Sequence, residues 1–296
     1  MSTEILGELY MTTTVVVLEP TDISLRVFSL VRLYTAIYLR GDLFDTAPIA
    51  STSSPQYPNQ ATAAVLSAFR GSRLQLAPAD VKVHYHSAIS LGIGAKLGQP
   101  SDRIAARIVE LLVQPRQPPQ DPHAVCLQVE IRSTDKGQII WEWEATQLLA
   151  WLHHAARCLP QLPWIRVSPS PDQILPLWPA CQAYARTHTW IDRANATVHE
   201  RIEVEANVLD PLDYRILVEL IQMIDRLLDH PMPHPVDFYV KTTKTVEQCF
   251  RSLERATTLA EVAGISAFRL GLVILIKTLL HCLLDAIFDQ KLAEKI

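Results

Sequence analysis

The chain has little glycine, and neither sign of charge dominates it. Only 9 of its 296 residues are glycine, whereas 20 are proline. This balance favours helices and extended connectors over the glycine-rich loops that wrap phosphate groups. The net charge is −4, with 13 basic and 14 acidic residues up to residue 160 and 14 against 17 after it. Neither part has the basic excess of a protein that binds nucleic acid tightly and without sequence preference.

Cysteine is also scarce, and its spacing excludes the usual disulfide and zinc frameworks. The chain has five cysteines, and no two of them form a CxxC pair. We therefore place the protein in a reducing compartment, the cytoplasm. The best candidates for metal ligands are His84, His86, His153, His154 and Cys126. Because no second cluster with zinc-ligand spacing accompanies them, we expect neither a metal nor a cofactor.

The sequence contains no evident catalytic set of side chains. Cys282 follows His281, but neighbouring positions of a helix point about 100° apart, so the two side chains do not face each other. We expect Cys282 to be a buried packing residue. Glu142 and Glu144 share one side of a strand, and the alternation of apolar and polar residues predicts that this side faces solvent.

The longest apolar run covers residues 270–288, which is long enough for a membrane span. Lys277, His281 and Asp285 interrupt this run at steps of four and form one polar stripe along a helix. Such a stripe indicates a core helix with one edge in water, so we expect no membrane insertion.

Residues 84–112, HYHSAISLGIGAKLGQPSDRIAARIVELL, predict a helical hairpin. Apolar residues recur at three and four positions on both sides of Gly98. Gly98 is suited to end the first helix, Pro100 prevents its continuation, and Ser101 is suited to cap the second helix.

The rest of the chain divides at a proline-rich segment. The other expected elements of the first part are a helix at 23–40, a loop at 45–62, strands at 125–132 and 138–144 around the turn STDKG, and a helix at 145–159. Residues 1–159 therefore form an expected α+β domain, with helices on a small antiparallel sheet. Residues 160–179 contain six prolines and predict an extended, semi-rigid linker. Residues 180–296 predict an all-α bundle, with helical patterns at 179–205, 210–229, 235–256 and 264–290.

The order of these pieces resembles that of arginyl-tRNA synthetases without their middle. The hairpin at 84–112, followed by two strands and ATQLLAWL, resembles the N-terminal appended domain of that family. AYARTHTWIDRA (183–194), DPLDYRILVELIQMIDRLL (210–228) and FRLGLVILIKTLLHCLLDAIF (268–288) resemble its C-terminal helical anticodon-binding domain of the DALR type. The resemblance implies the same two folds and an ancestral contact with tRNA.

The departures from the family concern the catalytic apparatus. A large nucleotide-binding domain separates the two pieces in the synthetases, whereas here the gap is the linker at 160–179. No HIGH-like signature occurs, and KTTKT (241–245) lies inside the helical domain instead of forming a KMSKS loop. We therefore expect a non-catalytic paralogue that is not an enzyme.

Two sets of residues are candidates for RNA contact. The first interleaves aromatic and basic side chains and consists of Tyr184, Arg186, His188, Trp190 and Arg193, which suits base stacking with phosphate contacts. The resemblance places it near an anticodon loop, although the family's YAHAR segment is present only as YARTH (184–188). The alternative is an amphipathic helix in which Tyr184 and Trp190 are packed. The second set is Lys241, Lys244, Arg251 and Arg255, for which the alternative is a solvated helix face.

Two functions of different classes remain. The first is a module that binds tRNA or another structured RNA. The second is a scaffold, assembly factor or subunit of a larger complex that has kept the fold and lost RNA binding. The acidic balance favours the second function, and six tryptophans and eight tyrosines provide side chains that often anchor protein interfaces.

Overall fold

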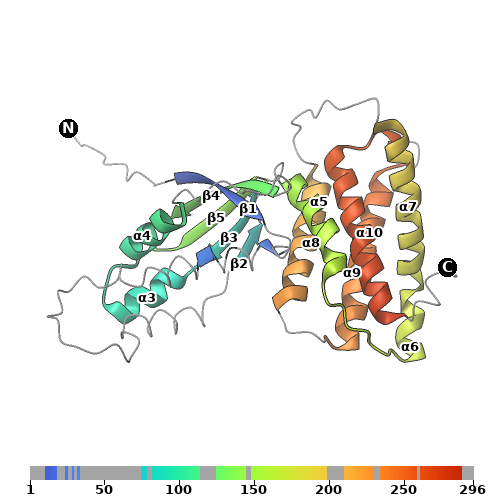
Figure 1. Ribbon diagram of the computed structural model, residues 1–296, viewed down its shortest axis with the longest axis horizontal. Coiled ribbons are helices and arrows are strands. Elements are labelled where there is room, and N and C mark those ends of the chain that lie inside the picture. The colour runs from blue at the N-terminus through green and yellow to red at the C-terminus, as the bar shows by residue number, and fades with distance from the viewer. Residues whose placement is uncertain are drawn as a thin grey trace. The chain divides into compact units, whose positions relative to one another are not determined.

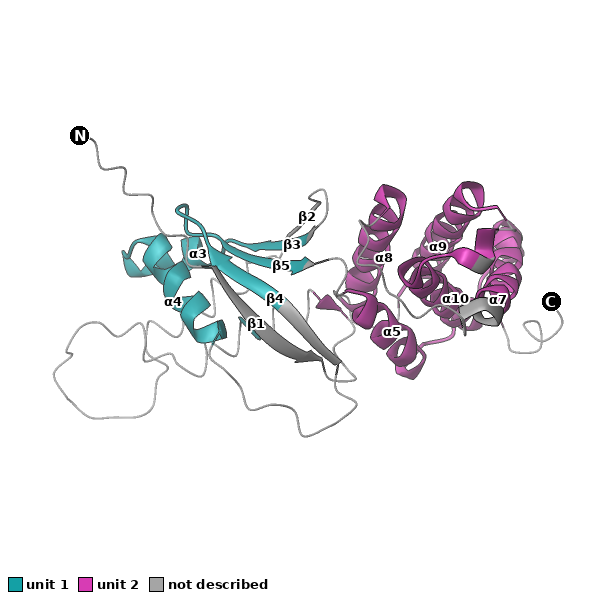
Figure 2. Cartoon of the chain, turned by 90° about the horizontal axis from the view of Figure 1, so that it is seen from above, with its two compact units in different colours: residues 1–17, 26–144 teal, residues 18–25, 145–296 magenta. Residues whose placement is uncertain are grey.

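The computed structural model (Figure 1) describes residues 11–18, 24, 25, 29, 32, 33, 75–78, 82–113, 125–144, 148–198, 210–229, 234–258 and 261–288. Contacts within the chain divide it into two compact units (Figure 2). Unit 1 holds residues 1–17 and 26–144, and unit 2 holds residues 18–25 and 145–296. An α+β unit is thus followed by a helical unit, as expected.

The sheet of unit 1 has five strands in the order β1-β4-β5-β3-β2. They are β1 (Met11–Leu18), β2 (Gln75–Pro78), β3 (Lys82–Ser87), β4 (Val125–Ser133) and β5 (Ile139–Glu144). The neighbours β2 and β3, β3 and β5, and β4 and β5 are antiparallel, which confirms the expected hairpin of β4 and β5. Tyr85, Trp141 and Ile131 form a cross-strand row on one face of the sheet, and all three side chains are fully buried.

Two helices of unit 1, α3 (Ile89–Leu97) and α4 (Ser101–Val113), form the expected helical hairpin. Gly98 ends α3 with a left-handed φ of 63°, and its N–H donates to the carbonyl of Gly94. This confirms the predicted stop. Ser101 is the first residue of α4, one position later than a capping residue, since the carbonyl of Pro100 accepts the N–H of Ile104 at 3.3 Å. The buried side of α4 packs against β4.

The turn between β4 and β5 fits closely against the start of α4. Gly137 in this turn has a φ of 73°, and a Cβ atom there would lie 2.5 Å from Ser101 Oγ and 2.7 Å from its backbone carbon. The hydroxyl of Ser90 in α3 donates to the carbonyl of Gly137. Only glycine satisfies both the backbone conformation and the space at this position.

Unit 2 is a bundle of helices around α10 (Figure 1). Its elements are α5 (Leu148–Cys158), η3 (Leu159–Gln161), α6 (Pro171–Ile174), η4 (Leu175–Leu177), α7 (Trp178–Val198), α8 (Pro211–Asp229), α9 (Val236–Ala256), η5 (Glu261–Gly264) and α10 (Ala267–Ile287). Helix α10 contacts α5, α7, α8 and α9. The four longest helices confirm the four helical patterns expected after residue 178, with starts that differ by one to three residues. The ends expected at 205 and 290 lie outside the described residues.

Among the described helices, α10 is long and apolar enough to cross a membrane by length and composition. In its most apolar 18-residue window, with a mean hydropathy of 2.0, 72% of the residues are buried inside the protein. His281 is exposed, whereas Lys277 and Asp285 are half-buried. This is the arrangement of a core helix with one polar edge, which the sequence predicts.

The boundary between the units differs from the expected one. Residues 148–158 belong to unit 2, because α5 buries Trp151, Leu152 and Ala155 and packs on α10. The packing is close enough that a Cβ atom on Gly271 would lie 2.9 Å from Leu149 Cδ1. The segment 160–179 is also only partly extended, since it contains η3, α6 and η4. A helix belongs to the unit that buries its apolar face. The number of prolines in a neighbouring segment does not show which unit that is.

Most of the helix expected at 23–40, and all of the loop expected at 45–62, lie outside the described residues. Of the helix, the structure describes five buried residues: Ser24, Leu25, Ser29, Arg32 and Leu33. The last four are helical. Their spacing of four, three and one residues is that of one helix face.

Candidate nucleic-acid interface

Helix α7 carries five of the candidate residues, and the structure distributes them over three sides of the helix. Trp190 belongs to the core: its side chain is 2% exposed, and its ring meets that of Phe250 in α9 edge-on at 5.5 Å. A buried indole cannot stack on a base, so the packing interpretation applies to Trp190. Its place among the candidates for RNA contact is wrong.

The side of α7 toward α10 carries Tyr184 and His188. The ring of Tyr184 stacks on His281 of α10, with 5.8 Å between centroids and 12° between planes, and His188 meets Tyr184 edge-on at 4.9 Å. Burial and the charge of Asp285 raise the pKa of Tyr184. Burial and the nearby Lys277 ammonium lower the pKa of His188, although Asp192 opposes them. Tyr184 is half-buried and His188 is exposed, so this side has aromatic surface within reach of a ligand.

The side of α7 toward α9 carries the arginines. Arg186 Nη2 lies 3.2 Å from Glu254 Oε2 in α9. Burial raises the pKa of the Glu254 carboxyl, while the charges of Arg186 and Arg251 act against this rise. Arg193, two turns further along α7, is exposed. The aromatic and basic candidates of α7 therefore face different neighbours, because Tyr184 and Arg186 are only two residues apart on a helix.

Helix α9 contributes the second candidate set as a single stripe. Lys241, Lys244 and Arg255 are exposed, and Arg251 is half-buried in an ion pair with Glu247 one turn away. Steps of three, seven and four residues keep all four on one helix face, which extends about 21 Å at 1.5 Å per residue. We call Arg186, Arg193, Lys241, Lys244, Arg251 and Arg255 the basic band. Glu254 and Glu247 pair with Arg186 and Arg251 of the band, and Asp237 lies on the same stripe of α9.

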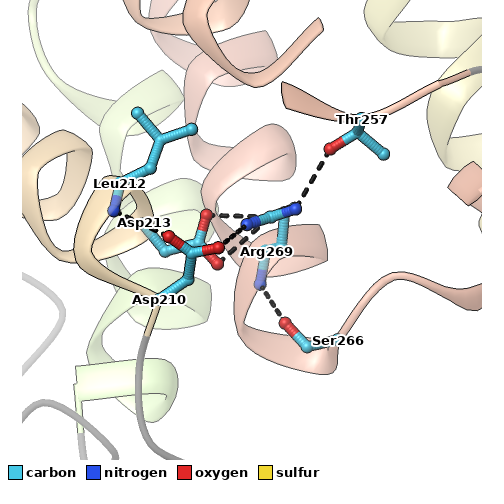
Figure 3. Close-up of polar contacts among 6 residues, drawn as sticks. All are labelled: Asp210, Leu212, Asp213, Thr257, Ser266 and Arg269. Carbon is cyan, nitrogen blue, oxygen red and sulfur yellow. Dashed lines mark hydrogen bonds and ion pairs between the residues drawn. The ribbon is translucent and has the colours of Figure 1, made fainter. Parts of the chain in front are cut away.

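A second cluster of charge lies at the start of α10 and is partly buried (Figure 3). Arg269 Nε donates to both carboxylate oxygens of Asp213, at 2.8 and 3.1 Å, and Nη2 donates to Asp210 Oδ2 at 2.9 Å. Nη1 donates to Thr257 Oγ1 at 3.0 Å. The Asp213 side chain is 4% exposed and that of Arg269 is 15% exposed. Burial raises the pKa of the Asp213 carboxyl, although the hydrogen bond and the charge of Arg269 oppose this.

Residues of the same cluster and Ser266 also cap the first turns of two helices. Asp210 Oδ1 accepts the N–H of Leu212 at 2.8 Å at the beginning of α8, and Ser266 Oγ accepts the N–H of Arg269 at 3.1 Å at the beginning of α10. Arg269 thereby joins the starts of α8 and α10 to the end of α9. Its guanidinium donates to side chains of the protein itself, so this cluster serves the fold and offers no phosphate site.

The polar face of the sheet in unit 1 corrects another expectation. Glu142 is 6% exposed instead of facing solvent. His84 and Glu130 lie directly across from it on the neighbouring strands. His84 Nε2 lies 3.4 Å and Arg132 Nη2 lies 3.6 Å from Glu142 Oε2. Strand alternation correctly predicts which residues share a face, but whether that face is covered depends on the rest of the fold.

Metal ligands do not gather in the part of the chain that the structure describes, where no group of three or more His, Cys, Asp or Glu side chains can hold a metal ion. Cys158, Cys181, Cys249 and Cys282 are free and buried. Burial and the charge of Asp285 raise the pKa of Cys282 to about 12, so this thiol stays protonated at neutral pH, in agreement with its expected packing role.

The sequence patterns did not single out Glu254, Lys277, His281 and Asp285 as neighbours of the candidate residues. For Lys277, His281 and Asp285, the feature of the sequence that could have indicated this was the polar stripe on the otherwise apolar α10. Comparisons of the chain with protein-family models, with curated proteins and with solved structures find no match. The resemblance to arginyl-tRNA synthetases therefore rests on the quoted motifs alone.

Proposed function

We propose that this protein is a non-catalytic RNA-binding module related to arginyl-tRNA synthetases, with unit 2 as a DALR-type anticodon-binding domain that contacts tRNA or another structured RNA. The observation that carries the proposal is the basic band. Arg186 and Arg193 from α7 join the cationic stripe of α9, and the ion pair of Arg186 with Glu254 holds the two helices' charges side by side.

The local charge balance supports this role. The basic band contains six cationic side chains, and two of them, Arg186 and Arg251, pair with Glu254 and Glu247. The chain as a whole has a net charge of −4, so this group of cations contrasts with the charge of the whole chain. A positive surface binds the phosphate backbone largely through the release of counterions.

The test is tRNA binding measured by fluorescence anisotropy over a series of salt concentrations. We expect the affinity for total tRNA to fall steeply with salt for the wild-type chain. The variant Arg186→Glu/Lys244→Glu removes two cations, so the slope of log K against log salt should decrease in size by about two. The control Arg103→Glu/Arg226→Glu makes the same change of net charge at exposed positions of α4 and α8. Equal losses of affinity in the two variants, or no binding by the wild type, would contradict the proposal.

A second candidate function is favoured by exposed apolar residues at the start of α7. Trp178 is 55% exposed and Leu175, one turn earlier, is 77% exposed. Tryptophan side chains are typical anchors of protein interfaces, and an exposed leucine one turn away adds to the apolar surface. Affinity purification from the native cell, followed by RNA sequencing and mass spectrometry, separates the two functions. A scaffold predicts a protein partner that the Trp178→Ser/Leu175→Ser variant loses, without enrichment of tRNA.

A further inference from the structure

Helix α7 has one side that no other element of unit 2 covers. Helical structure continues without a break from α6 through η4 into α7, over residues 171–198. Helix α7 lies at the edge of the bundle (Figure 1, Figure 2), and its other sides pack against α9, α10 and η5. The uncovered side carries six exposed residues at alternating steps of four and three, which we call the outer stripe: Pro171, Leu175, Trp178, Gln182, Ala185 and Thr189.

The outer stripe is uncharged, and its two ends differ in volume. Its first half holds Leu175, which is 77% exposed, and Trp178, which is 55% exposed. Its second half ends in the small side chains of Ala185 and Thr189. A solvent-facing helix side is ordinarily rich in charge, whereas steps of four and three without charge are the spacing at which two helices pack along each other.

Opposite charges lie at the two ends of the outer stripe. Asp172 is at its beginning and Arg193 lies just past its end, and both are exposed. The two residues are three repeats of seven residues apart, so they lie on the same flank of the stripe. The same separation is about 31 Å along a helix. Asp172 and Arg193 of one chain therefore cannot meet each other.

A two-fold axis through the middle of the outer stripe brings its opposite ends together. If the axis passes between Gln182 and Ala185, Trp178 of each copy lies across from Thr189 of the other. A large side chain then meets a small one, as interdigitating helix faces require. Asp172 of each copy comes beside Arg193 of the other, and a two-fold interface repeats this contact. The outer stripe is thus complementary to itself in volume and in charge.

We propose that two copies of this protein associate through the outer stripe as an antiparallel helix pair, with Trp178 as the anchor and with Asp172 and Arg193 fixing the register. A parallel pair would set the two Trp178 side chains and the ends of like charge at the same level, which disfavours it. One helix pair is a small interface, so the dimer is weak and reversible. The inference does not depend on RNA binding, although Arg193 also belongs to the basic band.

The first test is sedimentation equilibrium of the full chain over a series of protein concentrations, without RNA. We expect the wild type to follow a monomer–dimer equilibrium. Trp178→Ser should raise the dissociation constant at least about 30-fold, which is the effect of losing a tryptophan that anchors an interface. The control Ile165→Ser, at an apolar position of the proline-rich segment that is 39% exposed, should leave the constant unchanged.

The second test exchanges the charges. Asp172→Arg and Arg193→Asp each set like charges opposite each other, so each variant alone should associate about tenfold more weakly than the wild type. An equimolar mixture of these two variants should regain the wild-type association, because their mixed dimer contains two pairs of opposite charge. Arg226→Asp, which makes the same change of charge as Arg193→Asp at an exposed position of α8, should have no effect.

A wild type that stays monomeric at every concentration would overturn the inference and leave the outer stripe to a different protein. A dimer that Trp178→Ser does not weaken would show that another surface associates. A mixture that associates no better than its two components would overturn the antiparallel register. None of these outcomes bears on the proposed RNA binding, which is measured separately with tRNA.

Discussion

Units 1 and 2 join their elements by different means. In unit 1 the β4–β5 turn lies against the start of α4 through a backbone contact without charge, at Gly137 and Ser101. In unit 2 the ends of α8, α9 and α10 meet at a partly buried ion cluster around Arg269. The register of a sheet is set by its apolar pattern and its turns, so at the β4–β5 turn a steric fit is enough. Apolar helix faces pack with less directional preference, and the directed bonds of a guanidinium fix how the helices align.

The charged residues of unit 2 also differ from one another in how deeply they are buried. Asp213 and Arg269 are shielded from water and stabilise the fold through fixed hydrogen bonds. The basic band is largely exposed, so its charges add little to stability. Charged residues therefore have different roles within one helical bundle. Four predictions test the comparisons between the two units and between the buried and exposed residues of unit 2.

The largest expected effect concerns the core under the basic band. Trp190→Ala should lower the free energy of unfolding by about 4 kcal/mol, because it leaves a cavity beside Phe250. Trp178→Ala, on the same helix but 55% exposed, should change it by less than about 0.5 kcal/mol. Urea denaturation followed by far-UV circular dichroism measures both. Similar losses for the two variants would contradict the assignment of Trp190 to the core.

The next effect concerns the ion cluster. Arg269→Met should cost about 3 kcal/mol, because it leaves the buried Asp213 carboxylate without its partner. The double variant Arg269→Met/Asp213→Leu should recover most of this loss, since an apolar pair can replace a buried ion pair. Hydrogen exchange of peptides from α8 and α10 reports on the cluster locally. Arg226→Met, at an exposed position of α8, is the control, and equal exchange in both methionine variants would refute the role of Arg269.

The contact between the β4–β5 turn and α4 in unit 1 should depend on the volume of the side chain at Gly137 and not on charge. Gly98→Ala introduces only the strain of a left-handed residue, about 1 kcal/mol, because nothing lies within 4 Å of the added Cβ atom. Gly137→Ala adds a clash with Ser101 to the same strain, so we expect a cost of at least about 2 kcal/mol. The difference between the two variants in thermal denaturation measures the clash. A difference of zero would mean that the turn and α4 move apart without cost.

The smallest effect is a dependence of stability on pH. The pKa of His188 is lowered in the folded protein, so the unfolded chain binds more protons just below the ordinary histidine pKa of about 6.5. Stability therefore rises as the pH rises through this window, and is partly lost as the pH falls through it. The effect should be well under 1 kcal/mol because solvent screens an exposed group. His188→Gln should flatten the profile of urea midpoint against pH, whereas His153→Gln, on the exposed side of α5, should leave it unchanged.

Several elements could be predicted from the sequence because their causes are local. Gly98 ends α3 because a left-handed residue and Pro100 together stop a helix, and both are visible within three residues. The four long helices of unit 2 follow from apolar positions at three and four residues. The burial of Trp190 and Glu142 could not be predicted in the same way, since periodicity shows which residues share a face but not which neighbour covers it.

The helices, the β-hairpin and the polar stripe of α10 follow from local sequence, since each depends on residues within a few turns or one strand pair. The packing of distant elements was needed to establish that α5 joins unit 2, that Arg269 meets an aspartate 56 residues away, and that the proline-rich segment and α10 line a cleft. It also separated Tyr184 from Arg186, two neighbours in the chain, onto the sides of α7 that face α10 and α9. Side-chain periodicity is a property of one element, whereas burial and pairing depend on which elements pack together, and that choice involves the whole fold.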